Sequence, residues 1–315
     1  MRALIFFIII IFSCNENSVQ MLPGSNGNIN TISVVIENEL WEGNVGKEIR
    51  AHLEKPSYGL PQEEPLFDLK QMPPKIFSGF ATKSRSIIKV EIKEKEEVYF
   101  SSNDYAFPQR IIYIQAKNNQ SLISLIKKNS DLIRSYIYAG EISEKQRRIK
   151  KSKNSSNIFM NKFGLSLTFP SAYRVAKSNQ NFVWIRRDIQ TGSVNLFVSR
   201  VLNFEDKNII KIRDSLSKMH IPGNDPSVSF MSTDTLYKTV TKKIKIDTIL
   251  VHETRGLWEA KGQFMAGPFI NYLINLHPQK NETYMLDGFV YSPGTRKRDY
   301  LFEIESIMRS IKIQD

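Results

Sequence analysis

The sequence contains a single cysteine, Cys14, among its 315 residues. The chain beyond it therefore has no disulfide framework, no thiolate metal site and no cysteine nucleophile. Histidine is also scarce, with four widely spread residues. The only fragment of a zincin motif begins at His252 and lacks its second histidine, because Gly256 stands in that position. Isolated histidines are more often packed or surface residues than ligands, so no metal site is predicted.

Motifs for nucleophilic or phosphate chemistry are missing as well. There is no G-x-S-x-G elbow and no Walker-type phosphate loop, and the S-x-x-K letters at 215–218 lack their partner motifs. Carboxylates lie close together in sequence at Glu63-Glu64 and at Glu303 and Glu305. Glu303 and Glu305 are two residues apart on a predicted helix, so their side chains point in different directions. All four acids are interpreted as parts of solvated faces. The sequence thus predicts no catalytic residue and no cofactor.

Long hydrophobic runs are absent too, and the longest one is near the amino terminus. Ala3–Phe12 has ten apolar residues, whereas a bilayer-spanning helix needs about 20. The run follows Arg2 and precedes the small Ser13, which is the layout of a secretory signal. The tetrapeptide IFSC, ending at Cys14, resembles the bacterial lipobox, with Ile11 in place of the usual leucine.

This resemblance implies that residues 1–13 are a cleaved lipoprotein signal peptide and that Cys14 carries the lipid. The alternative is a buried cysteine in an amino-terminal strand. Residues 14–29 are rich in Asn, Gly and Ser, as in a flexible tether. Two or more acyl chains anchor a protein stably, so a lipidated Cys14 would hold the protein at a membrane. The expected location is the outer membrane, with the protein facing the periplasm. Surface display is less expected, since NENS after Cys14 holds one acid, Glu16.

The net charge of +12 is concentrated in part of the chain. Residues 145–153, KQRRIKKSK, carry six basic residues and no acid. An exported protein rarely meets nucleic acid, so its anionic neighbours would be lipid headgroups or lipopolysaccharide phosphates. The candidate contacts are Arg147, Arg148, Lys150 and Lys151. The alternative is a solvated linker or the polar end of a helix.

Hydrophobic periodicity predicts an α+β protein. In the amino-terminal half, β-branched runs predict strands at 31–36, 86–92 and 110–115, and apolar spacing predicts helices over 41–53 and 120–138. In the carboxyl-terminal half the main predictions are strands at 182–189, 193–202, 269–277 and 283–292, and helices at 206–219 and 297–312. We expect two α/β-sandwich-like domains, the second an antiparallel sheet packed between helices. Their expected bounds are 30–140 and 158–315, with a charged linker at 141–157.

Parts of the sequence resemble a known protein family and a known fold. The segments ISVVIENELWEGNVGKEIR and GLPQEEP, with the lipobox, resemble a family of Bacteroidota lipoproteins of unknown function over nearly the whole chain. The segments GLSLTFPSAYRV, GFVYSP and IMRSIK, all within residues 158–315, resemble the PsbP-like and Mog1-like fold. In that fold a central antiparallel sheet lies between helices. The first resemblance implies no activity. The second implies a fold that often serves accessory roles.

One segment is a candidate partner surface. GLWEAKGQFMAGPF at 256–269 interleaves aromatic residues and methionine with glycines. The side chains expected to contact a partner are Trp258, Phe264, Met265 and Phe269. The alternative is a bulged core strand that enters a loop. We expect a non-enzymatic envelope accessory whose partners are the membrane, through its anchor, and an envelope protein or lipopolysaccharide. The alternative function is an envelope hydrolase that acts on glycan or lipid with paired carboxylates.

Overall fold

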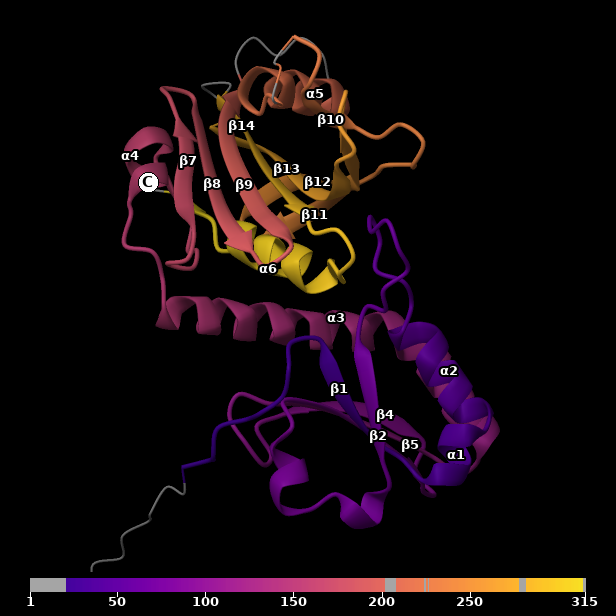
Figure 1. Ribbon diagram of the computed structural model, residues 1–315. Coiled ribbons are helices and arrows are strands. Elements are labelled where there is room, and N and C mark those ends of the chain that lie inside the picture. The colour runs from indigo at the N-terminus through magenta and orange to yellow at the C-terminus, as the bar shows by residue number, and fades with distance from the viewer. Residues whose placement is uncertain (1–20, 202–207, 224, 226, 278–281, 314–315) are drawn as a thin grey trace, which may run out of the picture.

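The computed structural model describes residues 21–201, 208–223, 225, 227–277 and 282–313. It confirms an α+β protein, in which two halves, each built on a sheet, lie on either side of one long helix (Figure 1). The second sheet is antiparallel and lies between helices, as expected.

The amino-terminal half is a five-stranded sheet in the order β2-β1-β3-β5-β4. All neighbours pair in parallel except the edge strand β4, which is antiparallel to β5. The strands are β1 (Thr31–Val35), β2 (Asp68–Met72), β3 (Ser86–Ile92), β4 (Glu97–Ser102) and β5 (Arg110–Ala116). The predicted strand at 86–92 is confirmed at both ends. The edge strand β4 was not predicted.

Helices cover one face of this sheet. They are α1 (Asn38–Glu42), α2 (Asn44–Leu53) and α3 (Asn119–Lys151). The helix predicted over 41–53 is instead two helices, α1 and α2, with Gly43 between them. The two helices pack closely because Gly46 has no side chain. A Cβ atom at Gly46 would lie 1.9 Å from the Trp41 carbonyl oxygen. The other sheet face is covered by the short turns η1 (Pro74–Ile76) and η2 (Gly79–Lys83) and by the loop that holds Tyr105.

The helix α3 runs past the predicted end at 138 and through most of the predicted linker, so the linker prediction is wrong for residues 141–151. Beyond Ile137 the buried side of the helix consists of Ile142 and Ile149 together with the carboxylates Glu141 and Glu144. Both carboxylates are paired with arginine, which offsets the desolvation cost of their burial. Because two of these buried positions are acidic, the apolar pattern alone does not show that the helix continues.

The tether prediction also needs correction. Within residues 14–29, the described part from Pro23 onward is held against the body by backbone hydrogen bonds. The Pro23 carbonyl accepts from the N–H of Phe107 at 2.8 Å, and the Asn26 N–H donates to the Lys83 carbonyl at 2.8 Å. Cys14 and the rest of residues 1–20 lie outside the described residues.

The carboxyl-terminal half is a curled antiparallel sheet in the order β10-β12-β13-β14-β9-β8-β7, with β11 paired to β12. Its strands are β7 (Arg174–Ser178), β8 (Phe182–Ile189), β9 (Gly192–Val201), β10 (Met231–Thr233), β11 (Val240–Ile246), β12 (Ile249–Ala260), β13 (Ala266–His277) and β14 (Glu282–Tyr291). A small separate pair joins β6 (Leu165–Ser166) to β15 (Lys312–Ile313).

This sheet has a hydrophobic core on each face. One core includes α6 (Arg298–Met308) and α4 (Ile158–Phe163), and the other includes α5 (Ile209–His220). The helix α6 approaches the sheet closely because Gly288 has no side chain. A Cβ atom there would lie 2.0 Å from Cγ2 of Ile304.

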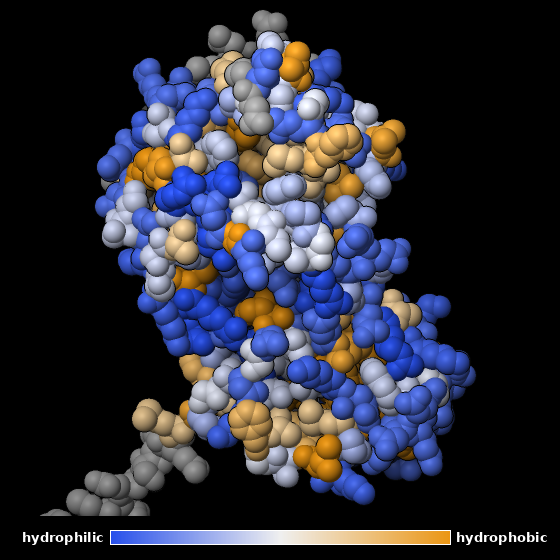
Figure 2. Space-filling model, in the orientation of Figure 1, coloured by the Kyte–Doolittle hydropathy of each residue, from blue (hydrophilic) through white to orange (hydrophobic). Residues whose placement is uncertain are grey.

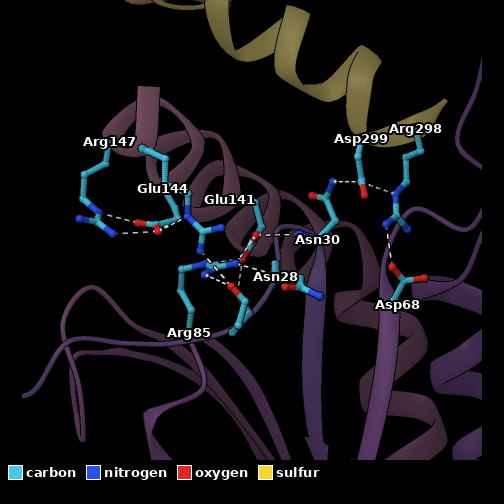
Figure 3. Close-up of polar contacts among 12 residues, drawn as sticks. Asn28, Asn30, Asp68, Arg85, Glu141, Glu144, Arg147, Arg298 and Asp299 are labelled. Atoms are coloured by element: carbon cyan, nitrogen blue, oxygen red, sulfur yellow. Dashed lines mark hydrogen bonds and ion pairs between the residues drawn. The ribbon is translucent and has the colours of Figure 1, made fainter. Parts of the chain in front are cut away.

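The two halves are joined by a buried polar network (Figure 3). Within the amino-terminal half, Arg85 donates to both carboxylate oxygens of Glu141 and so holds α3 against the sheet. Between the halves, the Arg298 guanidinium donates to Asp68 at 2.7 Å. The Glu64 carboxylate accepts the backbone N–H groups of Lys297 and Arg298 at 2.8 and 2.9 Å, so an acid of the amino-terminal half caps the helix α6.

Candidate functional site

The candidate partner segment at 256–269 forms the end of β12, a turn and the start of β13. Its four proposed contact side chains separate into two groups. Trp258 and Phe269 are buried in the core beneath α5, with exposed fractions of 3% and 0%, so most of their surface packs within the chain, as in the alternative of a core strand. Phe264 is fully exposed at the turn, and Met265 is half-buried beside it. Because side chains alternate between the two faces of a strand, Trp258 on β12 and Phe269 on β13 both point to the sheet face that carries α5.

Met265 and Trp258 nevertheless line a groove on the face of the sheet that carries α5. The groove has a volume of about 280 Å³. The aromatic and methionine side chains that line it come from β8, β10, β12 and β14, from the segment before β10 and from the turn before β13: Trp184, Phe230, Met231, Trp258, Met265, Phe289 and Tyr291. The groove is also lined by the polar side chains of Arg186, Ser193, Asn195 and Gln263, so aromatic and polar groups are both exposed in it. Concave sites that combine aromatic side chains with fixed polar groups are typical of ligand and partner binding.

The groove exists because the helix α5 covers only part of its sheet face. The helix ends at His220, and Pro222 and Gly223 then form one wall of the groove. The indole of Trp258 lies toward β14, where its Nε1–H donates to the Val290 carbonyl at 3.2 Å. Gly267 permits this, because a Cβ atom there would lie 2.0 Å from that carbonyl oxygen.

The aromatic rings and the polar groups of the groove are fixed by one another. Phe289 lies between two indoles, with ring centroids 5.6 Å from Trp258 and 6.3 Å from Trp184. Asn195 accepts the Nε1–H of Trp184 at 3.2 Å and donates to the Ser193 hydroxyl at 3.0 Å. Because these side chains are already held in place, the groove loses little conformational entropy when it is occupied.

Trp184, Phe289 and Tyr291 are groove residues that the sequence does not predict. They lie on predicted strands, but no local signal separates an aromatic residue of a groove from one of the core. Only the length of α5 and the pairing of β8 with β9 and of β9 with β14 decide which strand positions stay uncovered.

A second cavity, of about 360 Å³, lies between the two halves. It is lined by residues of α3, β11, β12 and α6 and of the loop at 56–66, among them the carboxylates Glu253 and Glu305. Arg255 bridges the two, donating to Glu253 at 3.0 Å and to Glu305 at 2.6 Å. Arg309 donates to the other oxygen of Glu305 at 2.8 Å.

These ion pairs determine the charge state of the cavity. Burial alone would raise the pKa of Glu305, but Arg255 and Arg309 beside it lower that pKa to about 2. Glu305 therefore carries no proton near neutral pH and is not a general acid. These ion pairs lie within the carboxyl-terminal half, and Tyr138 of α3 joins the two halves here by donating to Glu305 at 2.5 Å.

The acids predicted to lie on solvated faces are buried in several cases, which corrects that interpretation. Glu64 caps α6, and Glu303 accepts from Tyr173, Lys145 and Arg187 at 3.0, 2.7 and 2.8 Å. The helix α6 is covered by the sheet on one side and by α3 on the other, so its charged side also lies inside (Figure 1). Among the described residues, no cluster of three or more His, Cys, Asp or Glu could hold a metal ion.

The four basic candidates lie in the last turns of α3. Arg147 and Arg148 donate to Glu144 at 2.6 and 2.7 Å, so both guanidinium groups have partners within the chain. Lys150 and Lys151 are exposed, and their charge is favourable at a helix carboxyl terminus. No helix in the described part of the chain is both long and apolar enough to cross a bilayer.

Two family models match the chain. Residues 25–150 match "Domain of unknown function (DUF8532)" and residues 151–310 match "Domain of unknown function (DUF4837)". The two matches meet in the last turn of α3. No curated protein matches the sequence.

Among solved structures the similarity is weak. The chain is similar to a mutant of the protein Mog1, with 9% identity and a TM-score of 0.31 over 48% of this chain and 92% of that one. It is also similar to the Saccharomyces cerevisiae Ran-binding protein Mog1p, with 8% identity and a TM-score of 0.32 over 48% of this chain and 91% of that one.

Proposed function

The chain belongs to the family described as Domain of unknown function (DUF4837), and we propose that it is a non-enzymatic, lipid-anchored binding or assembly accessory of the cell envelope. The groove lined by Trp184, Trp258 and Phe289 is the recognition site in this proposal. Its partner is an envelope protein that inserts apolar side chains. The anchor is the lipid on Cys14, placed in the outer membrane with the body facing the periplasm, as in the Bacteroidota lipoproteins that the sequence resembles.

The observation that carries this proposal is the open, aromatic groove beside exposed apolar side chains. Phe264 and Val228 are exposed, and they flank the groove residues Gln263, Met265 and Phe230 in the sequence. Fixed aromatic residues in a pocket contribute most of the binding energy at many protein interfaces. Apolar side chains exposed together on a folded surface are typical of such sites.

The alternative, an envelope hydrolase, would need paired carboxylates, one of which is protonated. The two carboxylates that share a cavity, Glu253 and Glu305, both accept hydrogen bonds from Arg255. Since the pKa of Glu305 is lowered to about 2, that residue has no proton to donate.

The test is crosslinking in intact cells, followed by co-purification and mass spectrometry. We expect one stoichiometric envelope protein with the native chain. We expect that protein to be lost with the double variant Phe264→Ala and Met265→Ala. The matched control is Leu236→Ala, which removes another highly exposed apolar side chain, away from the groove lining.

The outcomes separate the parts of the proposal. A partner that the groove variant retains would show that the groove is not the recognition site. A partner lost from Cys14→Ala but recovered from the native chain would support the role of the anchor. If the native chain recovers no partner, the accessory role is refuted and glycan and lipid substrates should be screened.

A further inference from the structure

A second group of exposed apolar side chains lies on the amino-terminal half, on the sheet face opposite α2 and α3. We name it the amino-terminal patch. Its residues and exposed fractions are Met21 (90%), Leu22 (42%), Ile76 (54%), Phe80 (77%) and Phe107 (60%). Figure 2 shows apolar side chains along the lower edge of this half, next to the point at which the described chain begins.

Three segments that are distant in sequence form this patch. The extended segment at 21–28 makes β-bridges to Phe107 through Gly24 and to Ser84 through Asn26. The turns η1 and η2 lie between β2 and β3, just before Ser84. Phe77, between the two turns, stacks edge-on against Tyr105, with ring centroids 5.6 Å apart. The patch is therefore part of the folded body.

The length of the chain before the patch places it near the lipid. Seven peptide units separate Cys14 from Met21, and a fully extended chain spans at most about 3.3–3.6 Å per residue, or about 25 Å here. The segment after Met21 is fixed to the body rather than free, as the hydrogen bonds of Pro23 and Asn26 show. A bilayer that holds Cys14 is thus within reach of the patch.

The charges around the patch suit an anionic lipid surface. Between Asp68 and Glu91 the chain contains no acid, and the basic side chains open to solvent there include the exposed Lys70 and Lys75 and the half-buried Lys83. Lys75 lies in η1 and Lys83 in η2, beside the exposed Ile76 and Phe80. Apolar side chains combined with Lys or Arg are typical of surfaces that lie in the headgroup region.

We propose that the amino-terminal patch is a membrane-docking surface, which lies among phospholipid headgroups and holds the body against the bilayer. This inference rests on the proposed lipid attachment at Cys14. Phe80 and Phe107 would insert into the boundary between headgroups and acyl chains, while Lys75 and Lys83 bind lipid phosphates. The aromatic groove lies in the other half of the molecule and stays free for a partner.

The single cysteine makes this surface directly testable. Once Cys14 is lipidated, a cysteine introduced elsewhere is the only free thiol in the chain. The variant Phe80→Cys and its control Leu236→Cys, both at highly exposed apolar positions, are purified as lipidated full chains. Each is labelled with a thiol-reactive fluorophore and reconstituted into vesicles of phosphatidylethanolamine and phosphatidylglycerol that contain a spin-labelled lipid quencher.

We expect loss of most of the fluorescence at Phe80→Cys and little loss at Leu236→Cys. Charge reversal by Lys75→Glu with Lys83→Glu should restore part of the Phe80→Cys fluorescence. The same reversal at Lys127 and Lys128, which are exposed on α3, should not.

Two results would overturn the docking surface while leaving the anchor intact. One is equal quenching at both labels on vesicle-bound protein. The other is a Phe80→Cys label that is shielded in cells but unquenched by lipid, which would indicate a protein on the patch. A chain whose mass shows no lipid on Cys14 would instead refute the anchor, and with it this inference, before any vesicle is prepared.

Discussion

The buried carboxylate of Glu305 gives a quantitative prediction for the stability of the interface between the two halves. Its side chain is 1% exposed and lies between Arg255 and Arg309, with Tyr138 donating to it at 2.5 Å. These partners lower its pKa from 4.5 to about 2. A pKa that is lower in the folded state stabilises the fold above the unfolded-state pKa, and this stabilisation is lost as the pH falls through the folded-state value.

The magnitude follows from the size of the shift. At about 1.4 kcal/mol per pKa unit, Glu305 contributes about 3 kcal/mol to the free energy of unfolding at pH 7. The same two pKa values give about 1 kcal/mol at pH 3, and almost nothing well below pH 2. The variant Glu305→Gln should therefore be less stable than the native chain by about 3 kcal/mol at pH 7, with a difference that shrinks between pH 5 and pH 2.

Urea denaturation followed by tryptophan fluorescence, repeated from pH 7 to pH 3, measures this difference. The matched control is Glu94→Gln, which removes the same charge from an exposed turn between β3 and β4. Its stability should stay close to that of the native chain at every pH. A loss in Glu305→Gln that is as large at pH 3 as at pH 7 would refute the reasoning, since the effect would then be one of packing rather than of charge.

Two further predictions concern the carboxyl-terminal half. Asp287→Asn removes the carboxylate that accepts from Nε of the fully buried Arg213 at 2.8 Å. Urea denaturation should therefore show a free energy of unfolding that is lower by about 3–5 kcal/mol. A decrease below about 1 kcal/mol would contradict the buried pair. Gly288→Ala places a methyl group against Ile304 of α6 and should cost about 1–3 kcal/mol by overpacking. Adding Ile304→Ala should then cost less than it does in the native chain, and additive losses in the double variant would contradict the close contact.

The helix α3 shows where a sequence pattern stops being informative. Its first half was predicted because Leu122, Ile126 and Ile133 repeat at helical spacing. Its second half was predicted as a linker because charged residues dominate it. Of those charges, Glu141 and Glu144 are buried and paired with arginines of the amino-terminal half and of α3 itself, whereas the lysines at the end of the helix are exposed. No local pattern distinguishes a paired buried glutamate from a solvated one.

The candidate site shows the same limit. The segment at 256–269 was selected for its aromatic residues, and two of its four side chains, Trp258 and Met265, do line the groove. Most of the rest of the lining comes from β8, β9, β10 and β14 and from the segments after α5 and before β10. Those residues meet only through long-range strand pairing, which is invisible in a single sequence.

The sequence by itself determined the α+β class and most of the strands and helices. Periodicity and residue chemistry are local properties, and these features depend on them. Only the tertiary structure decided which charged residues are buried, how Glu64 and Arg298 join the two halves, and which aromatic side chains remain open beside α5. Those outcomes depend on contacts between distant segments, whose free energy comes from desolvation and pairing that neither segment has alone.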